Sequence, residues 1–290
     1  MNDEIIVIAD AGGTKTQWLY SLSSNPKERK IYTTEGINIA VTPREVIADV
    51  IKNFSDHLLS YFKTASSCRL YFYGAGCNNE DAKNKLNELF SQNLDFKIAK
   101  SEFYSDLEGA ARALYGDGEG TVCILGTGSA SGVYNGKALI DSIPSLGYIM
   151  GDEGSGAFMG KELLNALFKR ELSEKIKVKL EGFTSLTLPT VIKNVYQTPG
   201  ANRYLSSFIP FIKENEGDTE IDNLIERSLK LFITKNVLKY KNRPNNKLRF
   251  AGSVASLFQE KLIRISAEHG LEADKFLQNP ILGLGDYYLD

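Results

Sequence analysis

The chain opens with a short apolar run and then an alternating run, and both patterns are typical of strands. Residues 4–10 (EIIVIAD) are typical of a buried strand that ends in a carboxylate. After a Gly-Gly turn, residues 16–22 (TQWLYSL) alternate as the hairpin partner of that strand would. Residues 30–35 (KIYTTE) predict a third strand. The chain therefore begins with three consecutive short strands.

Helical spacing replaces this pattern after residue 41. Apolar residues three and four apart predict a helix over residues 42–62, with a capping box from Thr42 to Glu45 and Pro43 at its first helical position. Strands and helices alternate after it, so the predicted order is βββαβαβα. The later elements are a strand at 68–76, a helix at 79–92, a strand at 96–102 and a helix at 105–116.

The pattern starts again near Gly120. The segments VIADAGGT and CILGTGS each run from an apolar strand into a turn of small residues, which predicts an internal duplication. Residues 151–240 are predicted to be mostly helical. Residues 247–270 predict a strand, a small-residue turn and a helix.

Length, charge and composition narrow the class of protein. With 290 residues, two domains are expected. The 34 Lys+Arg against 36 Asp+Glu leave no basic excess for binding nucleic acid. Three scattered Cys are too few for a disulfide framework. The two His each lie within a helical pattern, which leaves little material for a His-based zinc site or a Ser-His-Asp triad. The acidic start and short apolar runs predict a cytoplasmic protein with no membrane partner.

The turn around Gly12 and Gly13 has two interpretations. It is either a plain hairpin turn or a nest of backbone N–H groups that binds a phosphate. It matches neither GxxxxGK[ST] nor GxGxxG before a helix. Asp10 favours the phosphate site, because a carboxylate beside a phosphate requires a cation, and this predicts Mg²⁺ held by Asp10 directly or through water.

Four glycine-containing segments carry a family resemblance. DAGGTKTQW (residues 10–18), GTGSAS (126–131), GDEGSG (151–156) and FAGSVA (250–255) resemble, in order and spacing, the two phosphate segments, the sugar-side segment and the adenosine segment of the BadF/BadG/BcrA/BcrD ATPase family. That family belongs to the superfamily of sugar kinases, Hsp70 and actin. The chain is most similar to its N-acetylglucosamine kinase branch.

The resemblance implies an α/β fold of two ribonuclease-H-like (actin-like ATPase) lobes with a central nucleotide and sugar cleft. We expect an N-terminal lobe over residues 1–107 and a C-terminal lobe with a helical insertion over 108–278. A C-terminal helix at about 279–290 is expected to pack back on the first lobe.

The same resemblance implies three sets of ligand-binding residues, for the phosphates, the nucleoside and the sugar. They are Gly12, Gly13, Thr14, Lys15, Thr16, Gly126, Thr127, Gly128 and Ser129 for the phosphates of ATP, Gly252 and Ser253 for the nucleoside, and Asn38, Asp106, Thr127, Gly147 and Asp152 for the sugar.

Asp106 also has two interpretations. A capping box of Ser105 and Glu108 precedes a helix that ends at Gly116, and an acid in its first turn can simply match the helix dipole. The segment SDLEGAARA, however, resembles the family segment that carries the catalytic aspartate. The resemblance implies that Asp106 is the general base that accepts the proton of the attacking sugar hydroxyl.

The remaining polar candidates have similar alternatives. Asp152 and Glu153 precede a predicted helix and could match its dipole, although Asp152 is the better candidate for binding a sugar hydroxyl. Asn38 is also typical of a turn. Lys15 either neutralises phosphate charge or is solvated on a hairpin.

The predicted function is ATP- and Mg²⁺-dependent phosphorylation of the 6-hydroxyl of N-acetylglucosamine or a close relative. Two other functions stay open: a BadF-type ATPase that activates a redox enzyme through a shared iron-sulfur cluster, and a nonenzymatic nucleotide switch. Cys77 is the thiol to consider for the cluster. The expected partners are an amino sugar and ATP, and a homodimer is one open option for the assembly.

Overall fold

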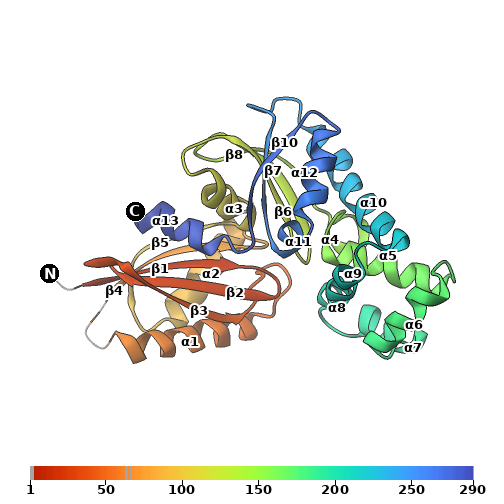
Figure 1. The fold of residues 1–290 in the computed structure, drawn as a ribbon. Helices are drawn as coiled ribbons and strands as arrows, with labels where there is room; N and C mark the ends of the chain where they lie inside the picture. The colour runs from red at the N-terminus through yellow and green to blue at the C-terminus, as the bar shows by residue number, and fades with distance from the viewer. Residues whose placement is uncertain (1–2, 63–64, 66, 290) are drawn as a thin grey trace. The chain divides into compact units, whose positions relative to one another are not determined.

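The computed structural model of the chain describes residues 3–62, 65 and 67–289 (Figure 1). Contacts divide the chain into two units. Unit 1 comprises residues 1–118 together with 279–290, and unit 2 comprises residues 119–278. The division falls after Gly118, where we expected it after residue 107, because the helix α3 (Asp106–Tyr115) packs on strands of unit 1.

Unit 1 is built on one five-stranded mixed sheet. The first three strands are antiparallel, and the first, fourth and fifth are parallel, so the order in the sheet is β3-β2-β1-β4-β5. The three predicted N-terminal strands are all present. The strands are β1 (Glu4–Ala11), β2 (Lys15–Leu22), β3 (Asn25–Glu35), β4 (Ser67–Gly74) and β5 (Lys97–Ser105).

Two helices, α1 (Arg44–Tyr61) and α2 (Glu80–Asn93), pack on one face of this sheet over an apolar cluster. At its centre Trp18 stacks on Phe54 with ring centroids 4.1 Å apart. The helix α1 corrects one prediction, because Pro43 is its N-cap and no side chain caps it. The Thr42 hydroxyl accepts the Asn38 N–H instead, which ties the helix to the preceding loop.

The helix α3 and the C-terminal helix α13 (Ile281–Leu289) pack against each other and against strands of unit 1. Gly283 makes this approach possible, because a Cβ there would lie 2.7 Å from the Ala113 carbonyl oxygen. A buried guanidinium joins the two helices: Arg112 donates to the hydroxyls of Tyr73 (2.7 Å) and Tyr288 (3.0 Å). The last helix of the chain is therefore an integral part of unit 1.

Unit 2 is built on a second sheet with the same topology, in the order β10-β9-β6-β7-β8. Strand for strand this equals the order in unit 1, which agrees with the predicted duplication. The last strand had not been predicted, because it is a largely exposed edge strand with no clear apolar alternation. The strands are β6 (Gly120–Leu125), β7 (Ser129–Tyr134), β8 (Leu139–Ile143), β9 (Lys247–Ala251) and β10 (Glu272–Leu277).

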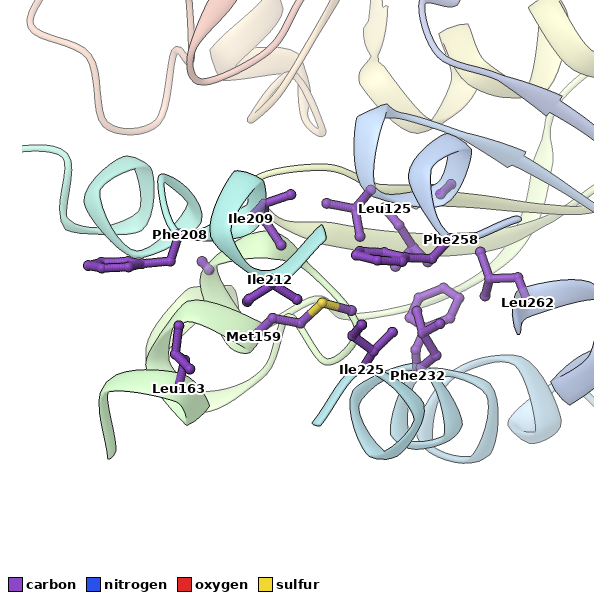
Figure 2. Close-up of a cluster of buried hydrophobic side chains, with 14 of the residues drawn as sticks. Leu125, Met159, Leu163, Phe208, Ile209, Ile212, Ile225, Phe232, Phe258 and Leu262 are labelled. Atoms are coloured by element: carbon purple, nitrogen blue, oxygen red, sulfur yellow. The ribbon is translucent and has the colours of Figure 1, made fainter. Parts of the chain in front are cut away.

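Helices make up most of unit 2 between β8 and β9, as predicted, and they share an apolar core with the sheet. Figure 2 shows this core, where Leu125 of β6 lies among Met159, Phe232 and Phe258. In the described part of the chain, no helix combines the length and the apolar character needed to cross a membrane. The helical elements are α4 (Gly147–Met150), α5 (Gly156–Phe168), α6 (Glu174–Phe183), α7 (Leu188–Ile192), the π-helix η1 (Lys193–Gln197), α8 (Ala201–Ser206), α9 (Ile209–Glu214), α10 (Thr219–Lys235), the 3₁₀ turn η2 (Val237–Lys239), α11 (Ser253–Leu257) and α12 (Gln259–Ala267).

Candidate functional site

The turn between β1 and β2 presents its backbone at the surface of unit 1. The Gly12 N–H donates to the Lys15 carbonyl (3.0 Å) and closes the turn. Thr14 and Lys15 are exposed, whereas Thr16 is fully buried and its hydroxyl accepts the Ile37 N–H (3.1 Å). Thr16 was predicted to contact a phosphate, but its hydroxyl is engaged with the loop that follows β3.

Gly36 supports the same turn, and sequence reasoning had missed it. A Cβ at residue 36 would lie 2.4 Å from the Gly12 carbonyl oxygen and 2.7 Å from the Thr14 nitrogen. The backbones therefore touch directly, and only glycine fits. A lone glycine in the segment EGIN gave no signal of this contact, because the contact joins residues more than twenty positions apart.

Asp10 and Asp106 lie at the same edge of the unit 1 sheet. Asp10 is near the end of β1, and Asp106 directly follows β5, with β4 running parallel between the two strands. Withdrawal from water and the nearby charge of Asp106 raise the pKa of Asp10 to about 7, against a smaller lowering effect of Lys15. Withdrawal from water also raises the pKa of Asp106. Two carboxylates close together in a poorly hydrated site favour either a bound proton or a bound cation.

Asp106 is not the cap of its helix. Ser105 is the N-cap, and its hydroxyl accepts the Glu108 N–H (3.1 Å). Glu108 pairs with Arg112 (3.0 Å), so it does not complete the predicted capping box. One oxygen of Asp106, Oδ1, accepts the Leu107 N–H (2.9 Å). Because an ionised carboxylate offers about four lone-pair sites, Asp106 retains capacity to accept a further hydrogen bond.

Asn38 organises the loop before α1. Its Oδ1 accepts the Ala40 N–H (3.0 Å), as in an Asx turn, and its carbonyl accepts the Thr42 N–H (2.8 Å). A Cβ on Gly76 would come within 2.7 Å of Asn38 Oδ1, so the two loops touch. The side-chain oxygen of Asn38 therefore stabilises the turn, and a ligand-binding role would use its NH₂ group.

The matching turn of unit 2 lies between β6 and β7. The Gly126 N–H donates to the Gly128 carbonyl (3.0 Å), as Gly12 does to Lys15 in unit 1. The N-terminus of α5 then binds the turn from the other direction, because the Gly156 N–H donates to the Gly126 carbonyl (2.8 Å) and the Ala157 N–H to the Thr127 carbonyl (3.1 Å). This leaves the turn firmly fixed within unit 2.

Asp152 faces this turn. Its Oδ1 accepts the Ser129 N–H (3.3 Å), and a Cβ on Gly128 would lie 3.1 Å from its Oδ2. Its backbone is left-handed, with φ at 56°, and burial raises the pKa of its carboxyl group to about 6. The N-cap of α5 is Ser155, so Asp152 lies before the helix and is not in its first turn. Burying a carboxylate this way costs stability, which favours a functional role.

Glu153 differs from its neighbour. Its carboxylate pairs with Lys235 of α10 (2.9 Å), and this partner helps hold its pKa below the ordinary value despite the opposing effect of burial. The pair of acids thus divides into an ion-paired glutamate and an aspartate directed at the glycine turn. The sequence analysis favoured Asp152 over Glu153 as the sugar ligand, and it had no sign of the ion pair that engages Glu153.

Two glycines of unit 2, Gly252 and Gly147, were predicted to contact the nucleoside and the sugar, and both have a left-handed backbone. Gly252 has φ at 107°, and a Cβ there would lie 2.3 Å from the Leu125 carbonyl oxygen, next to the Gly126 turn. Ser253 follows it as the exposed first residue of α11. Gly147 begins α4 with φ at 71°, and its carbonyl accepts the Gly151 N–H (2.8 Å). The candidate residues thus form two sets, one within each unit.

Several solved structures are similar to this chain. A protein from Porphyromonas gingivalis named as a putative N-acetylglucosamine kinase is 34% identical, with a TM-score of 0.89 and 98% of each chain covered. A protein of the same name from Chromobacterium violaceum is 18% identical, with a TM-score of 0.73 and 99% of each chain covered. Glucokinase from Balamuthia mandrillaris, in complex with glucose, is 14% identical, with a TM-score of 0.53, and the match covers 99% of this chain and 93% of that one. No model of a known protein family matches the chain, and no curated protein does.

The two sheets of equal topology, each with a glycine turn after its first strand, have the actin-like ATPase fold of these structures. At 34% identity over nearly the whole of both chains, the chain belongs to the same family as the Porphyromonas gingivalis protein.

Proposed function

We propose that this protein is an ATP-dependent sugar kinase that phosphorylates the 6-hydroxyl of N-acetylglucosamine, and that its family is the N-acetylglucosamine kinase branch of the BadF/BadG/BcrA/BcrD ATPases. The observation that carries the proposal is the position of Asp106 beside Asp10, where the strands β5 and β1 end. The Gly12–Thr14 turn follows β1 at the same place. The name of the 34% identical relative supports the choice of sugar.

In this proposal Asp106 is the general base. The Leu107 N–H holds one of its oxygens, and the remaining lone pairs accept the proton of the sugar hydroxyl as that hydroxyl attacks the γ-phosphorus. The bond from the γ-phosphorus to the β–γ bridging oxygen breaks in the same transfer, and ADP leaves. Partial withdrawal from water raises the proton affinity of the carboxylate, which helps it to take up that proton. Asp152 and Asn38 then orient the sugar through its other polar groups.

The glycine turns bind the phosphates through backbone N–H groups other than those of Gly12 and Gly126, which close the turns, and Lys15 and Thr14 add a cation and a hydroxyl. Oxygen donors near phosphates suit Mg²⁺, and the carboxylate of Asp10 fits as its protein ligand, because a divalent cation offsets the cost of ionising that half-buried group. When bound, Mg²⁺ would neutralise charge that develops on the phosphates.

The alternative of a redox activator is less well supported by the thiols. An iron-sulfur cluster shared between subunits requires thiolates at the subunit surface, yet Cys77 is only 1% exposed and burial raises the pKa of its thiol to about 11. Cys68 and Cys123 are also buried. Neither burial nor pKa favours a cluster at any of the three.

A phosphorylation screen with ATP and Mg²⁺ tests the proposal. N-acetylglucosamine should support faster ADP release than glucose, glucosamine or N-acetylmuramic acid, with the 6-phosphate as product. Faster or equal turnover of another sugar would refute the substrate assignment. ATP hydrolysis that no sugar stimulates would instead support a nucleotide switch.

A further inference from the structure

The ammonium group of Lys15 is held by a residue from the far end of the chain. Its Nζ donates to Oδ1 of Asn279 at 2.9 Å, across 264 positions of sequence. Lys15 is the first residue of β2, directly after the glycine turn. Asn279 is the first residue of the segment in which the chain returns to unit 1.

The chemistry of this contact preserves the positive charge. An amide oxygen is an uncharged acceptor, so it orients the ammonium without neutralising it. A carboxylate in the same place would form an ion pair and compete with any anionic ligand. Lysine has three N–H donors and this contact uses one, so the contact leaves two donors for an anionic ligand.

The position of Asn279 is fixed by its surroundings. Pro280 follows it and restricts its backbone, and the Pro280 carbonyl accepts the Leu284 N–H at the start of α13 (3.0 Å). The helix α13 is in turn held on unit 1 through Tyr288 and Arg112, and it contacts β1 and β2, the strands that flank the glycine turn. A long, flexible lysine side chain is thereby tied to a rigid support.

We propose that Asn279 is a positioning residue that holds the Lys15 ammonium group ready to bind a phosphate of the nucleotide. This inference rests on the proposed function, because it assigns Lys15 to the phosphates of ATP. It explains why an exposed lysine on a hairpin is bound to a neutral partner from the C-terminal segment.

Direct binding measurements by calorimetry, with ATP and with adenosine as probes, test the inference without relying on turnover. Asn279→Ala should weaken ATP binding roughly 3- to 10-fold, because the ammonium loses its fixed position, and should leave adenosine binding unchanged. Asn279→Asp should weaken ATP binding more than Asn279→Ala does, although it is the closer match in shape. A merely structural role predicts the reverse order. Gln278→Ala, at the exposed neighbouring position, is the matched control and should bind ATP normally.

A double-mutant cycle completes the test. In a Lys15→Ala background, Asn279→Ala should have no further effect on ATP affinity, because the two residues act through one ammonium group. Additive losses, equal losses for adenosine, or normal ATP affinity in both Asn279 variants would overturn the inference and leave the proposed function intact. A wild-type protein that binds no ATP would overturn both.

Discussion

At the scale of single residues, Asp106 and Asp10 are neighbours with different expected tasks. Asp106→Asn should lower kcat roughly 10²- to 10⁴-fold with ATP affinity largely retained, because an amide cannot accept the hydroxyl proton. Steady-state kinetics and ATP binding on the same preparation check this. Ser105 caps the helix in either case, so the fold should persist. A variant within a few fold of the parent would show that Asp106 has only a helix-terminal role.

Asp10→Asn should instead shift the Mg²⁺ dependence. The amide is a weaker ligand for a hard cation, so we expect half-maximal activity at a several-fold higher Mg²⁺ concentration. Removing this half-buried charge should at the same time leave the protein at least as stable, because the pKa of Asp10 is raised to about 7. Titration of activity with Mg²⁺ decides the point, and a profile identical to that of the parent would contradict the metal assignment.

Asp152 carries a cost that depends on pH. Its pKa is raised from 3.8 to about 6, so ionisation destabilises the folded state. This loss of stability is absent below pH 3.8, grows as the pH rises from there to about 6, and is complete above that. Asp152→Asn keeps an oxygen for the Ser129 N–H, and it should raise stability by about 1–2 kcal/mol near pH 8 but by little near pH 4.

Thermal unfolding at both pH values measures this difference, and sugar binding should fall in the same variant. A stabilisation that does not change with pH would mean that the carboxylate is not the source of the cost.

At the scale of elements, the glycine turn of unit 1 depends on a loop that does not belong to it. Gly36→Ala would place a methyl group 2.4 Å from the Gly12 carbonyl oxygen, so the backbone of one loop must move. We expect a loss of about 2–4 kcal/mol in stability and weaker ATP binding. Gly182→Ala, at an open position of α6, is the control and should be neutral or stabilising. Equal behaviour of the two variants would contradict the proposed support.

Elements with strong local patterns were predictable, and elements held by distant contacts were not. The apolar run of β1, the spacing of α1 and the repeated glycine turn were all readable from neighbouring residues. The strand β10 lies at the exposed edge of its sheet and has only a weak apolar pattern, so its pairing with β9 determines that it is a strand. The Thr42 hydroxyl could accept an N–H from the first turn of α1 or the N–H of Asn38, and in the structure it accepts the Asn38 N–H. Gly36 and Asn279 act across long separations in sequence, which no local signal reports.

At the scale of the whole molecule, unit 1 depends on residues from both ends of the chain. Deleting residues 280–290 should remove hydrogen-exchange protection from β1, β2 and α3, because α13 covers them and supplies the Tyr288 hydroxyl to Arg112. The strands of unit 2 should keep their protection. Leu282→Ala, at an exposed position of α13, is the control and should resemble the parent. Equal loss of protection in both units would contradict the expectation that α13 stabilises unit 1 alone.

The insertion of unit 2 between the two parts of unit 1 also sets an order of completion during synthesis. A ribosome makes all five strands of unit 1 before any of unit 2, yet it makes α13, the helix that packs on Ala113 and Leu19, only after unit 2. Unit 2 is continuous and has all of its residues before that helix exists. Domains are commonly completed in the order of their N-termini. Here the N-terminal unit is completed second, because β1, β2 and α3 lack the cover of α13 until that helix has been made after unit 2.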